Sequence, residues 1–247
     1  MAALRTTRAL VEDPQAALKL LTGGKETLHR FSVGRMLGLD ARSLDARYRE
    51  LHANTRFVGH VASMSKLAGR PLGGFARPAD LYVICRTIRP TFVLETGVAS
   101  GLSSAYILQA LEDNSLGKLY SIDLPDADTE ELLGVVLTRL PAGRQSGWVV
   151  PEWLRARWDL RIGKSRDLLP SLLDEVREVQ LFLHDSEHSF ENMMYEFEEV
   201  WPRLSEGGFV MSDDVNLPLT KGAFYAFAKK VGREPERLHA GFGAVRK

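Results

Sequence analysis

The 247-residue sequence has a single cysteine, Cys85, which excludes an intrachain disulfide framework. It also lacks net charge, because 32 lysines and arginines balance 32 aspartates and glutamates. A neutral chain has no overall electrostatic footprint for nucleic acid or for an anionic membrane. No apolar run approaches about 18 residues, and residues 1–5 lack the apolar core of a secretory signal. These absences favour a soluble, cytoplasmic protein without nucleic-acid or membrane partners.

The apolar content, in contrast, is ample: 45% of the residues are hydrophobic, enough for the core of one large α/β domain. Residues 1–70 carry polar, helical patterns, and we interpret them as a helical N-terminal extension that precedes the main domain, residues 71–247. We expect this extension to cover an edge of the sheet, to form a homodimer contact, or to act as a lid over a substrate.

One stretch organises the main domain. An apolar run at Thr91–Leu94 is typical of a strand buried on both faces, and a helical pattern starts near Ala105. The turn between them runs from Gly97 to Gly101. Glycines let the backbone approach a ligand closely, and the free N–H groups of the following helix favour an anionic group. The sequence therefore predicts a ligand pocket at this turn.

Strand and helix patterns alternate over the rest of the chain, which predicts a mostly parallel α/β sheet with right-handed crossovers. Ligands of such sheets bind at the carboxyl ends of the strands. The further predicted strands are Lys118–Ile122, Trp158–Ile162, Val179–Leu183, Phe209–Met211 and a terminal strand around Phe242–Arg246. The predicted helices include Asp80–Ile88, a helix bent or opened by Pro170, Phe190–Leu204 and one around Gly222–Val231.

Polar residues close several of these strands. They are Glu95, Asp123, Ser165, Asp185 and the pair Asp213 and Asp214. A buried parallel sheet has little reason to carry carboxylates there unless they meet a ligand or solvent. Each one alone can also be explained as a helix cap or a turn residue. Their common edge instead favours a ligand site.

The kind of ligand follows from the first two acids. The spacing of Gly97 and Gly101 departs from the Gly-x-Gly-x-x-Gly turn of dinucleotide enzymes. A carboxylate after the first strand can meet an ammonium group, and one after the second can accept both hydrogen bonds of a ribose diol. An amino acid joined to a nucleoside describes S-adenosylmethionine.

From Gly73 to the last strand, the sequence resembles the class I S-adenosylmethionine-dependent methyltransferases. Its motif order is similar to that of the metal-dependent catechol and caffeoyl-CoA type O-methyltransferases. The resemblance lies in residues 93–103, Val-Leu-Glu-Thr-Gly-Val-Ala-Ser-Gly-Leu-Ser, and in residues 163–170, Gly-Lys-Ser-Arg-Asp-Leu-Leu-Pro. It implies a Rossmann-like fold, a seven-stranded mostly parallel sheet with helices on both faces, and a small-molecule methyl acceptor.

The resemblance also implies roles for the donor site. Glu95 would face the methionine ammonium group, Ser103 its carboxylate, and Asp123 the ribose hydroxyls. The remaining residues that would contact S-adenosylmethionine are Gly97, Val98 and Gly101 in the turn, Gly163, Ser165 and Arg166 beside adenine, Gly73 and Gly74 in a closing loop, and Asp185.

A divalent metal such as Mg²⁺ is implied at Asp185, Asp213 and Asp214, because hard cations take oxygen ligands and three side chains leave positions open for a substrate. The related enzymes have an Asp-Asn pair where this chain has Asp213-Asp214. The alternative is that this pair caps a turn and that Asp185 contacts only the donor.

His188 stands three residues after Asp185, where the catechol enzymes carry a lysine proposed to accept the hydroxyl proton. An imidazole titrates near neutrality, which suits a general base. The alternatives for His188 are a metal ligand or a helix cap, and we assign His184 a structural or supporting role.

Three functions are compatible with these residues. The first is a small-molecule O-methyltransferase in which His188 and Asp185 are catalytic. The second is a metal-independent N- or sugar methyltransferase, and the third is a cofactor-binding protein that transfers no methyl group. The acceptor pocket of such folds is built from variable loops, so the sequence does not specify the acceptor.

Overall fold

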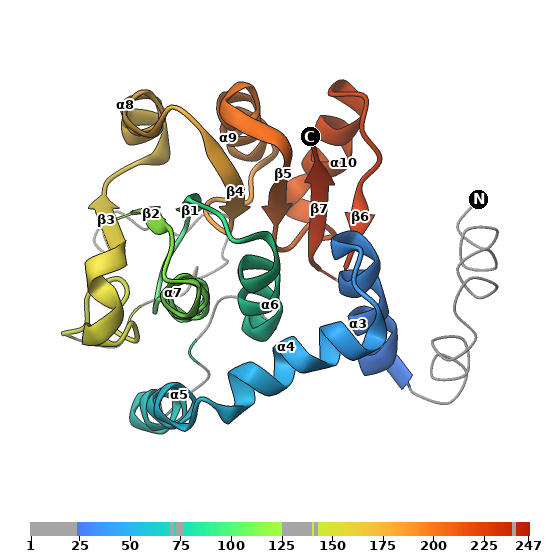
Figure 1. Cartoon of the computed structure of the whole chain (residues 1–247). Helices are drawn as coiled ribbons and strands as arrows, with labels where there is room; N and C mark the ends of the chain where they lie inside the picture. The colour runs from blue at the N-terminus through green and yellow to red at the C-terminus, as the bar shows by residue number, and fades with distance from the viewer. Residues whose placement is uncertain (1–23, 70–71, 73–76, 125–139, 141–142, 239–240) are drawn as a thin grey trace.

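A computed structural model describes residues 24–69, 72, 77–124, 140, 143–238 and 241–247. Its seven strands form one sheet in the order β3-β2-β1-β4-β5-β7-β6 (Figure 1). The strands are β1 (Phe92–Thr96), β2 (Lys118–Asp123), β3 (Trp158–Ile162), β4 (Val179–His184), β5 (Leu204–Ser212), β6 (Glu236–Arg237) and β7 (Gly243–Arg246). The chain reverses its direction of strand addition at β1, which places a ligand crevice at the carboxyl ends of β1 and β4.

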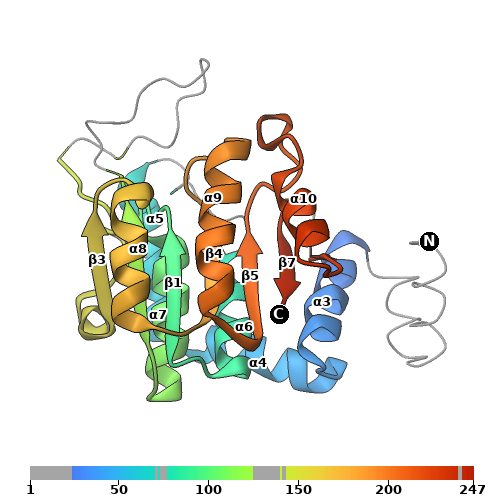
Figure 2. The same ribbon diagram turned by 90° about the horizontal axis from the view of Figure 1, so that it is seen from above.

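The sheet is mostly parallel. β1 pairs in parallel with β2 and β4, β2 with β3, and β4 with β5. β7 runs antiparallel to β5 and to β6. Figure 2 shows β1, β3 and β5 pointing one way and β7 the other. The predicted Rossmann-like, seven-stranded, mostly parallel sheet is confirmed.

Helices cover both faces of the sheet (Figure 1). α6 (Pro78–Ile88) and α7 (Leu102–Asn114) lie on one face, and α8 (Ser165–Val176), α9 (Phe190–Val200) and α10 (Ala223–Lys230) lie on the other. Each layer buries its own apolar cluster against the sheet. In α9 the buried apolar residues Met193, Phe197 and Val200 recur at helical spacing, and this stripe faces the sheet.

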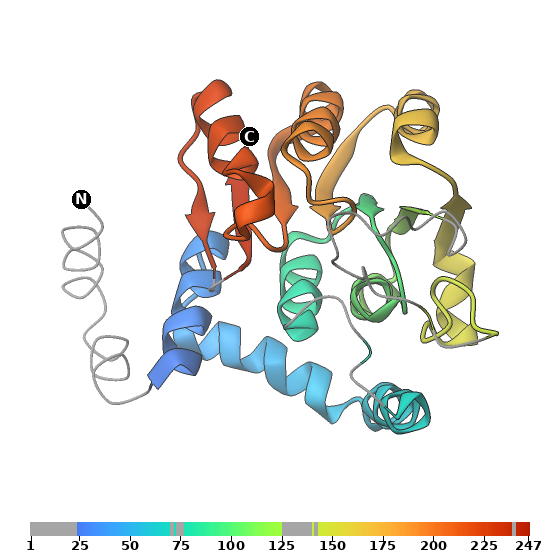
Figure 3. The same ribbon diagram turned by 180° about the vertical axis from the view of Figure 1, so that it is seen from behind.

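Three further helices precede α6: α3 (Gly24–Leu37), α4 (Ala41–Ala53) and α5 (Thr55–Ala68). Seen from behind, α4 runs from α3 beneath α6 towards α5 (Figure 3). The Tyr48 hydroxyl of α4 donates to Asp80 Oδ1 of α6 at 2.5 Å, and Arg86 of α6 pairs with Glu50. Residues 24–69 are therefore helical as expected, while the domain division at residue 70 stays a prediction.

The predicted helix Phe190–Leu204 is too long. α9 ends at Val200, a 3₁₀ turn η4 (Trp201–Arg203) follows, and Leu204 already opens β5. The predicted strand began only at Phe209, but β5 starts at Leu204 and continues through a register shift in its pairing with β4.

Pro170 does not open a helix, since it lies inside α8, and the predicted bend there stays a prediction. Proline has no N–H to donate to the carbonyl four residues earlier, that of Arg166. The Tyr195 hydroxyl donates to this carbonyl instead, at 3.2 Å. Two more 3₁₀ turns, η3 (Glu152–Arg157) and η5 (Pro218–Thr220), complete the described elements.

Candidate functional site

The sheet brings the predicted acids together around Asp185. Burial raises the pKa of Asp185 well above its usual range, and the negative charges of Asp213, Asp214, Glu95 and Asp123 raise it further. These residues follow or close β5, β1 and β2, so acids from four neighbouring strands share one edge. This edge has an excess of negative charge that a cationic ligand would relieve.

The glycine turn between β1 and α7 is shaped by close approach of the backbone. Gly97 has a φ of +85°, and a Cβ there would lie 2.0 Å from the carbonyl oxygen of Asp185. Gly101 has the same φ, and its Cβ would lie 2.7 Å from Cα of Gly147. Both positions therefore require glycine for sterics as well as for the left-handed conformation.

Asp123 closes β2 beside this turn. The N–H groups of Val98 and Ala99 donate to its two carboxylate oxygens at 3.0 and 3.2 Å, and the Ser146 hydroxyl donates to Oδ2. Burial raises the pKa of Asp123, and these hydrogen bonds lower it. The carboxylate is thus held rigidly at the floor of the predicted ribose site.

Glu95 is fully buried at the end of β1. Ser103 donates to Oε1 at 2.6 Å, and Ser104 and Ser121 donate to Oε2 at 2.6 and 2.8 Å. Burial raises the pKa of Glu95 and these three hydroxyls lower it. Oε2 accepts two hydrogen bonds and Oε1 only one, so Oε1 keeps a lone pair with which it could accept a hydrogen bond from the predicted methionine ammonium group.

The first turn of α7 offers a second polar feature. Gly101 is the N-cap and supplies no side-chain cap. The first N–H groups of a helix lack partners within the helix and carry its positive dipole end, which favours a carboxylate. The predicted contact of Ser103 with the methionine carboxylate would use this backbone, because its hydroxyl is bonded to Glu95.

The acids after β4 and β5 are less well satisfied than Glu95 and Asp123. Burial, followed by the charge of Asp214, raises the pKa of Asp213 to about 6, and burial also raises the pKa of Asp214. Gly241 approaches this pair from the segment before β7, and a Cβ there would lie 3.7 Å from Asp214 Oδ1 and 3.8 Å from Asp213 Oδ1. These are ordinary van der Waals distances, so a side chain as small as alanine would fit beside the two carboxylates.

His188 lies near one acid that follows β4 and one that follows β5. Its Nε2 is 3.9 Å from Asp185 Oδ1 and 4.0 Å from Asp214 Oδ2, and it has no hydrogen-bond partner among the described residues. Burial lowers the pKa of His188 to about 4, with a further contribution from His184. The imidazole is therefore neutral at pH 7, and its Nε2 is buried and unpaired.

Within the described residues, no group of three or more His, Cys, Asp or Glu side chains is arranged to hold a metal ion. Asp185, Asp213 and Asp214 are near one another but do not form a ready ligand set. The metal at these three residues stays a prediction.

The predicted adenine-side residues face α9. The hydroxyl of Ser165 hydrogen-bonds Glu196, and the Arg166 guanidinium lies 4.5 Å from the Tyr195 ring centroid. A Cβ at Gly163 would lie 2.8 Å from Leu168 Cδ1. Their contact with adenine stays a prediction, and the predicted loop glycines Gly73 and Gly74 lie outside the described residues.

Several polar residues of this edge were not found from the sequence. Ser146 comes from a segment 23 residues after Asp123, so no local pattern linked the two. Ser121 points from the neighbouring strand, and only the sheet pairing reveals that it reaches Glu95. Glu196 stands in the middle of α9 with the spacing of an ordinary helix residue.

A Rossmann-like sheet with a glycine turn after β1 and acids at its strand ends is the arrangement of class I S-adenosylmethionine-dependent methyltransferases. Residues 94–215 match the model of a methyltransferase domain family. Over these residues the chain is similar to a methyltransferase domain, which agrees with the family that the sequence resembles.

Solved structures share the fold. An O-methyltransferase from Bacillus cereus in complex with SAH aligns with a TM-score of 0.55 and 15% identity over 78% of this chain and 91% of its own. The O-methyltransferase TomG from Streptomyces achromogenes, involved in tomaymycin synthesis and solved with SAM, aligns with a TM-score of 0.55 and 17% identity over 77% of this chain and 88% of its own. The calicheamicin methyltransferase CalS11 aligns with a TM-score of 0.51 and 17% identity over 91% and 93%.

No curated protein sequence matches the chain significantly. Among the helices of the described residues, none has the length and apolar character needed to cross a membrane.

Proposed function

We propose that the protein transfers the methyl group of S-adenosylmethionine to a hydroxyl group of a small molecule. One observation carries the proposal: Asp185 follows β4, and the acids at the ends of β1, β2 and β5 add to the effect of burial in raising its pKa. A donor with a sulfonium and an ammonium group would neutralise this excess charge. The O-methyltransferases from Bacillus cereus and Streptomyces achromogenes, which share the fold and were solved with SAH and SAM, support the same donor.

The donor would supply a methyl group bonded to a positively charged sulfur. The chain would orient it with three features: the first turn of α7 for the methionine carboxylate, Asp123 for the ribose hydroxyls, and the Gly97–Gly101 backbone as the floor. Most of the rate gain in such a reaction comes from placing the acceptor oxygen in line with the methyl group.

His188 is the proposed base. When the acceptor oxygen forms its bond to the methyl carbon, the carbon–sulfur bond breaks and the hydroxyl proton passes to Nε2 of His188. The imidazole is neutral and its Nε2 is unpaired, so it can accept the proton. Its pKa of about 4 lies below the near-neutral value expected from the sequence and makes it a weaker base than an ordinary histidine. The imidazolium that forms would be stabilised by Asp185 and Asp214, whose oxygens lie 3.9 and 4.0 Å away.

Divalent-metal assistance by Asp185, Asp213 and Asp214 is a separate part of the proposal and does not enter the proton transfer above. Because the three carboxylates repel one another, a cation would lower their pKa values when it binds. Turnover with Mg²⁺ and with a chelator distinguishes a metal-assisted O-methyltransferase from a metal-independent N- or sugar methyltransferase.

Calorimetry with S-adenosylmethionine tests the donor, and turnover with 3,4-dihydroxybenzoate tests the transfer. We expect binding by the wild-type protein, and for His188→Ala we expect unchanged donor affinity with turnover reduced by about 10²–10³-fold. The exposed His52 of α4 provides the control, because His52→Ala should change neither quantity.

Two results would contradict the proposal. A wild-type protein that does not bind S-adenosylmethionine is not a methyltransferase. If His188→Ala transfers methyl groups at the normal rate, another group accepts the proton.

A further inference from the structure

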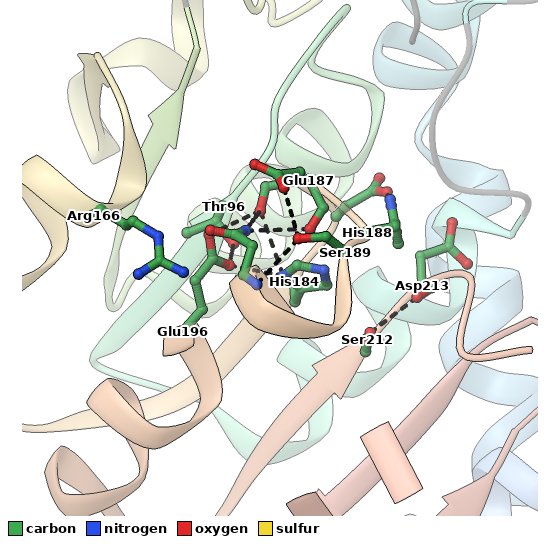
Figure 4. Close-up of polar contacts among 12 residues, drawn as sticks. Thr96, Arg166, His184, Glu187, His188, Ser189, Glu196, Ser212 and Asp213 are labelled. Atoms are coloured by element: carbon green, nitrogen blue, oxygen red, sulfur yellow. Dashed lines mark hydrogen bonds and ion pairs between the residues drawn. The ribbon is translucent and has the colours of Figure 1, made fainter. Parts of the chain in front are cut away.

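Glu196 of α9 is a fully buried acid that the proposed reaction does not use. Its Oε2 accepts hydrogen bonds from Thr96 Oγ1 at 2.5 Å and from His184 Nδ1 at 2.7 Å (Figure 4). Its Oε1 accepts from Ser186 Oγ at 2.8 Å and from Asn192 Nδ2 at 3.1 Å. These donors come from the ends of β1 and β4, from the loop after β4 and from α9.

The acid is ionised in this environment. Burial alone would raise the pKa of Glu196, but the charge and hydrogen bond of His184, with the hydroxyls of Ser165 and Thr96, lower it to about 2. A buried carboxylate is costly to desolvate, and well-packed apolar residues of similar volume often stabilise a fold equally well. The value of this network therefore lies in the geometry that it imposes.

That geometry concerns two acids of the crevice. The backbone N–H of Asp185 donates to the carbonyl of Thr96 at 2.8 Å, and the N–H of Asp213 donates to the carbonyl of His184 at 3.0 Å. Thr96 and His184 are the two residues whose side chains meet at Glu196 Oε2. Glu196 thus holds the backbone to which both acids are attached.

The same network holds the loop that carries His188. Asn192 Nδ2, which donates to Glu196, also lies 3.2 Å from the carbonyl of Glu187 and 3.3 Å from Ser186 Oγ. The rings of His184 and His188 pack edge to face, with centroids 5.2 Å apart (Figure 4). Residues 185–189 are therefore held against α9 by hydrogen bonds, while His188 lies near Asp185 and Asp214.

We propose that Glu196 is a positioning residue for the acceptor side of the site. It touches neither the donor nor the acceptor, and it fixes residues 185–189 so that His188 and Asp185 keep the placement that methyl transfer requires. The expected loss of kcat rests on the proposed function, whereas the expected loosening of residues 185–189 does not.

The test replaces the acid with its neutral isostere, Glu196→Gln, in the full-length protein. We expect amide hydrogen exchange across residues 185–189 to accelerate by about tenfold or more, while exchange in β3 stays unchanged. Donor affinity should stay within about threefold of the wild type, and kcat with 3,4-dihydroxybenzoate should fall by about 100-fold, since a 1 Å misplacement has that cost. Glu199→Gln, at an exposed position of the same helix, is the matched control and should change none of these.

Thr96→Val serves as a milder variant if Glu196→Gln does not fold, because it removes one hydroxyl donor and keeps the shape of the side chain. The same local acceleration of exchange is expected for it. Unchanged exchange at residues 185–189 overturns the proposal, and so does acceleration spread evenly over β3 and α9, which would indicate a merely structural acid. Failure of the wild type to bind S-adenosylmethionine would instead contradict the proposed function. The hydrogen-exchange result would then still decide whether Glu196 positions residues 185–189.

Discussion

The two halves of the crevice differ in how their polar groups are satisfied. In the half built from β1 and β2, Glu95 and Asp123 accept hydrogen bonds from serines and backbone N–H groups at every oxygen. In the half built from β4 and β5, Asp185 and Asp213 repel each other, and His188 Nε2 has no partner among the described residues.

Buried polar groups are normally hydrogen-bonded, so exceptions call for an explanation. The first half is already organised before any ligand binds, as expected of a site for a constant donor. The second half has unpaired groups that a ligand would complete, as expected where an acceptor and its proton are handled. Under the proposed function, this difference would separate donor binding from methyl transfer within one edge of the sheet.

The largest expected effect comes from Gly97, where the two halves touch. Gly97→Ala would place a Cβ 2.0 Å from the carbonyl oxygen of Asp185 at a φ of +85°. Because the obstacle is backbone, relief requires the two halves to separate. We expect the free energy of unfolding to fall by about 4 kcal/mol and Tm by roughly 10 °C, measured by thermal unfolding.

Gly143→Ala isolates the backbone contribution. Gly143 has a φ of +74° and no atom within 4 Å of its would-be Cβ, so we expect a loss of only about 1 kcal/mol from the left-handed conformation. Equal losses for the two variants would show that the halves are not in tight contact at Gly97.

Asp123→Asn tests whether the β1–β2 half binds the donor. The amide keeps the shape and one acceptor, but it loses the charge and the second acceptor for a ribose diol. We expect the Kd for S-adenosylmethionine to rise by about 10–100-fold, equivalent to roughly 1.4–2.7 kcal/mol, with calorimetry as the measurement. Asp159→Asn on neighbouring β3 is the control, and a donor affinity that is unaffected by Asp123→Asn would remove Asp123 from the site.

Asp213→Asn tests whether the buried carboxylates of the β4–β5 half destabilise the fold when they are ionised. Folding raises the pKa of Asp213 from 3.8 to about 6, mainly through burial and then through Asp214. A carboxyl with a raised pKa binds its proton more tightly in the folded state, so the folded state loses stability as the pH rises from about 4 through 6. The side chain at position 213 cannot ionise in the Asp213→Asn variant. We therefore expect the free energy of unfolding of the variant to exceed that of the wild type by about 2 kcal/mol above pH 6, with no difference below pH 4.

Thermal unfolding between pH 4 and 8 measures this difference. His188, whose pKa is lowered to about 4, has the opposite pH dependence, but it is present in both proteins and largely cancels. The exposed Asp174 gives the control variant Asp174→Asn. If the wild type is as stable as Asp213→Asn at pH 8, burial and the charge of Asp214 do not destabilise ionised Asp213. The proposed difference between the two halves of the crevice would then be wrong.

The sequence by itself determined the order of the strands and helices around the crevice, although not the short strand β6, and it determined the common edge of the acids. Strand and helix periodicities are local, and all carboxyl ends of parallel strands meet at one edge whatever the details of packing. Glu95, Asp123, Asp185 and Asp213 could therefore be assigned to one region before their contacts were known. The end of α9 was predicted wrongly, because Gly207 and Gly208 continue β5 and only pairing with β4 reveals this.

The tertiary structure alone decided which polar groups are satisfied. Ser146 meets Asp123, and His184 meets Glu196, across 23 and 12 residues of sequence. Such contacts depend on how helices and loops pack over the sheet, and no periodicity encodes them. The chain's composition and pattern specify the crevice, while the packing of α9 and the loop after β4 specifies how its two halves differ.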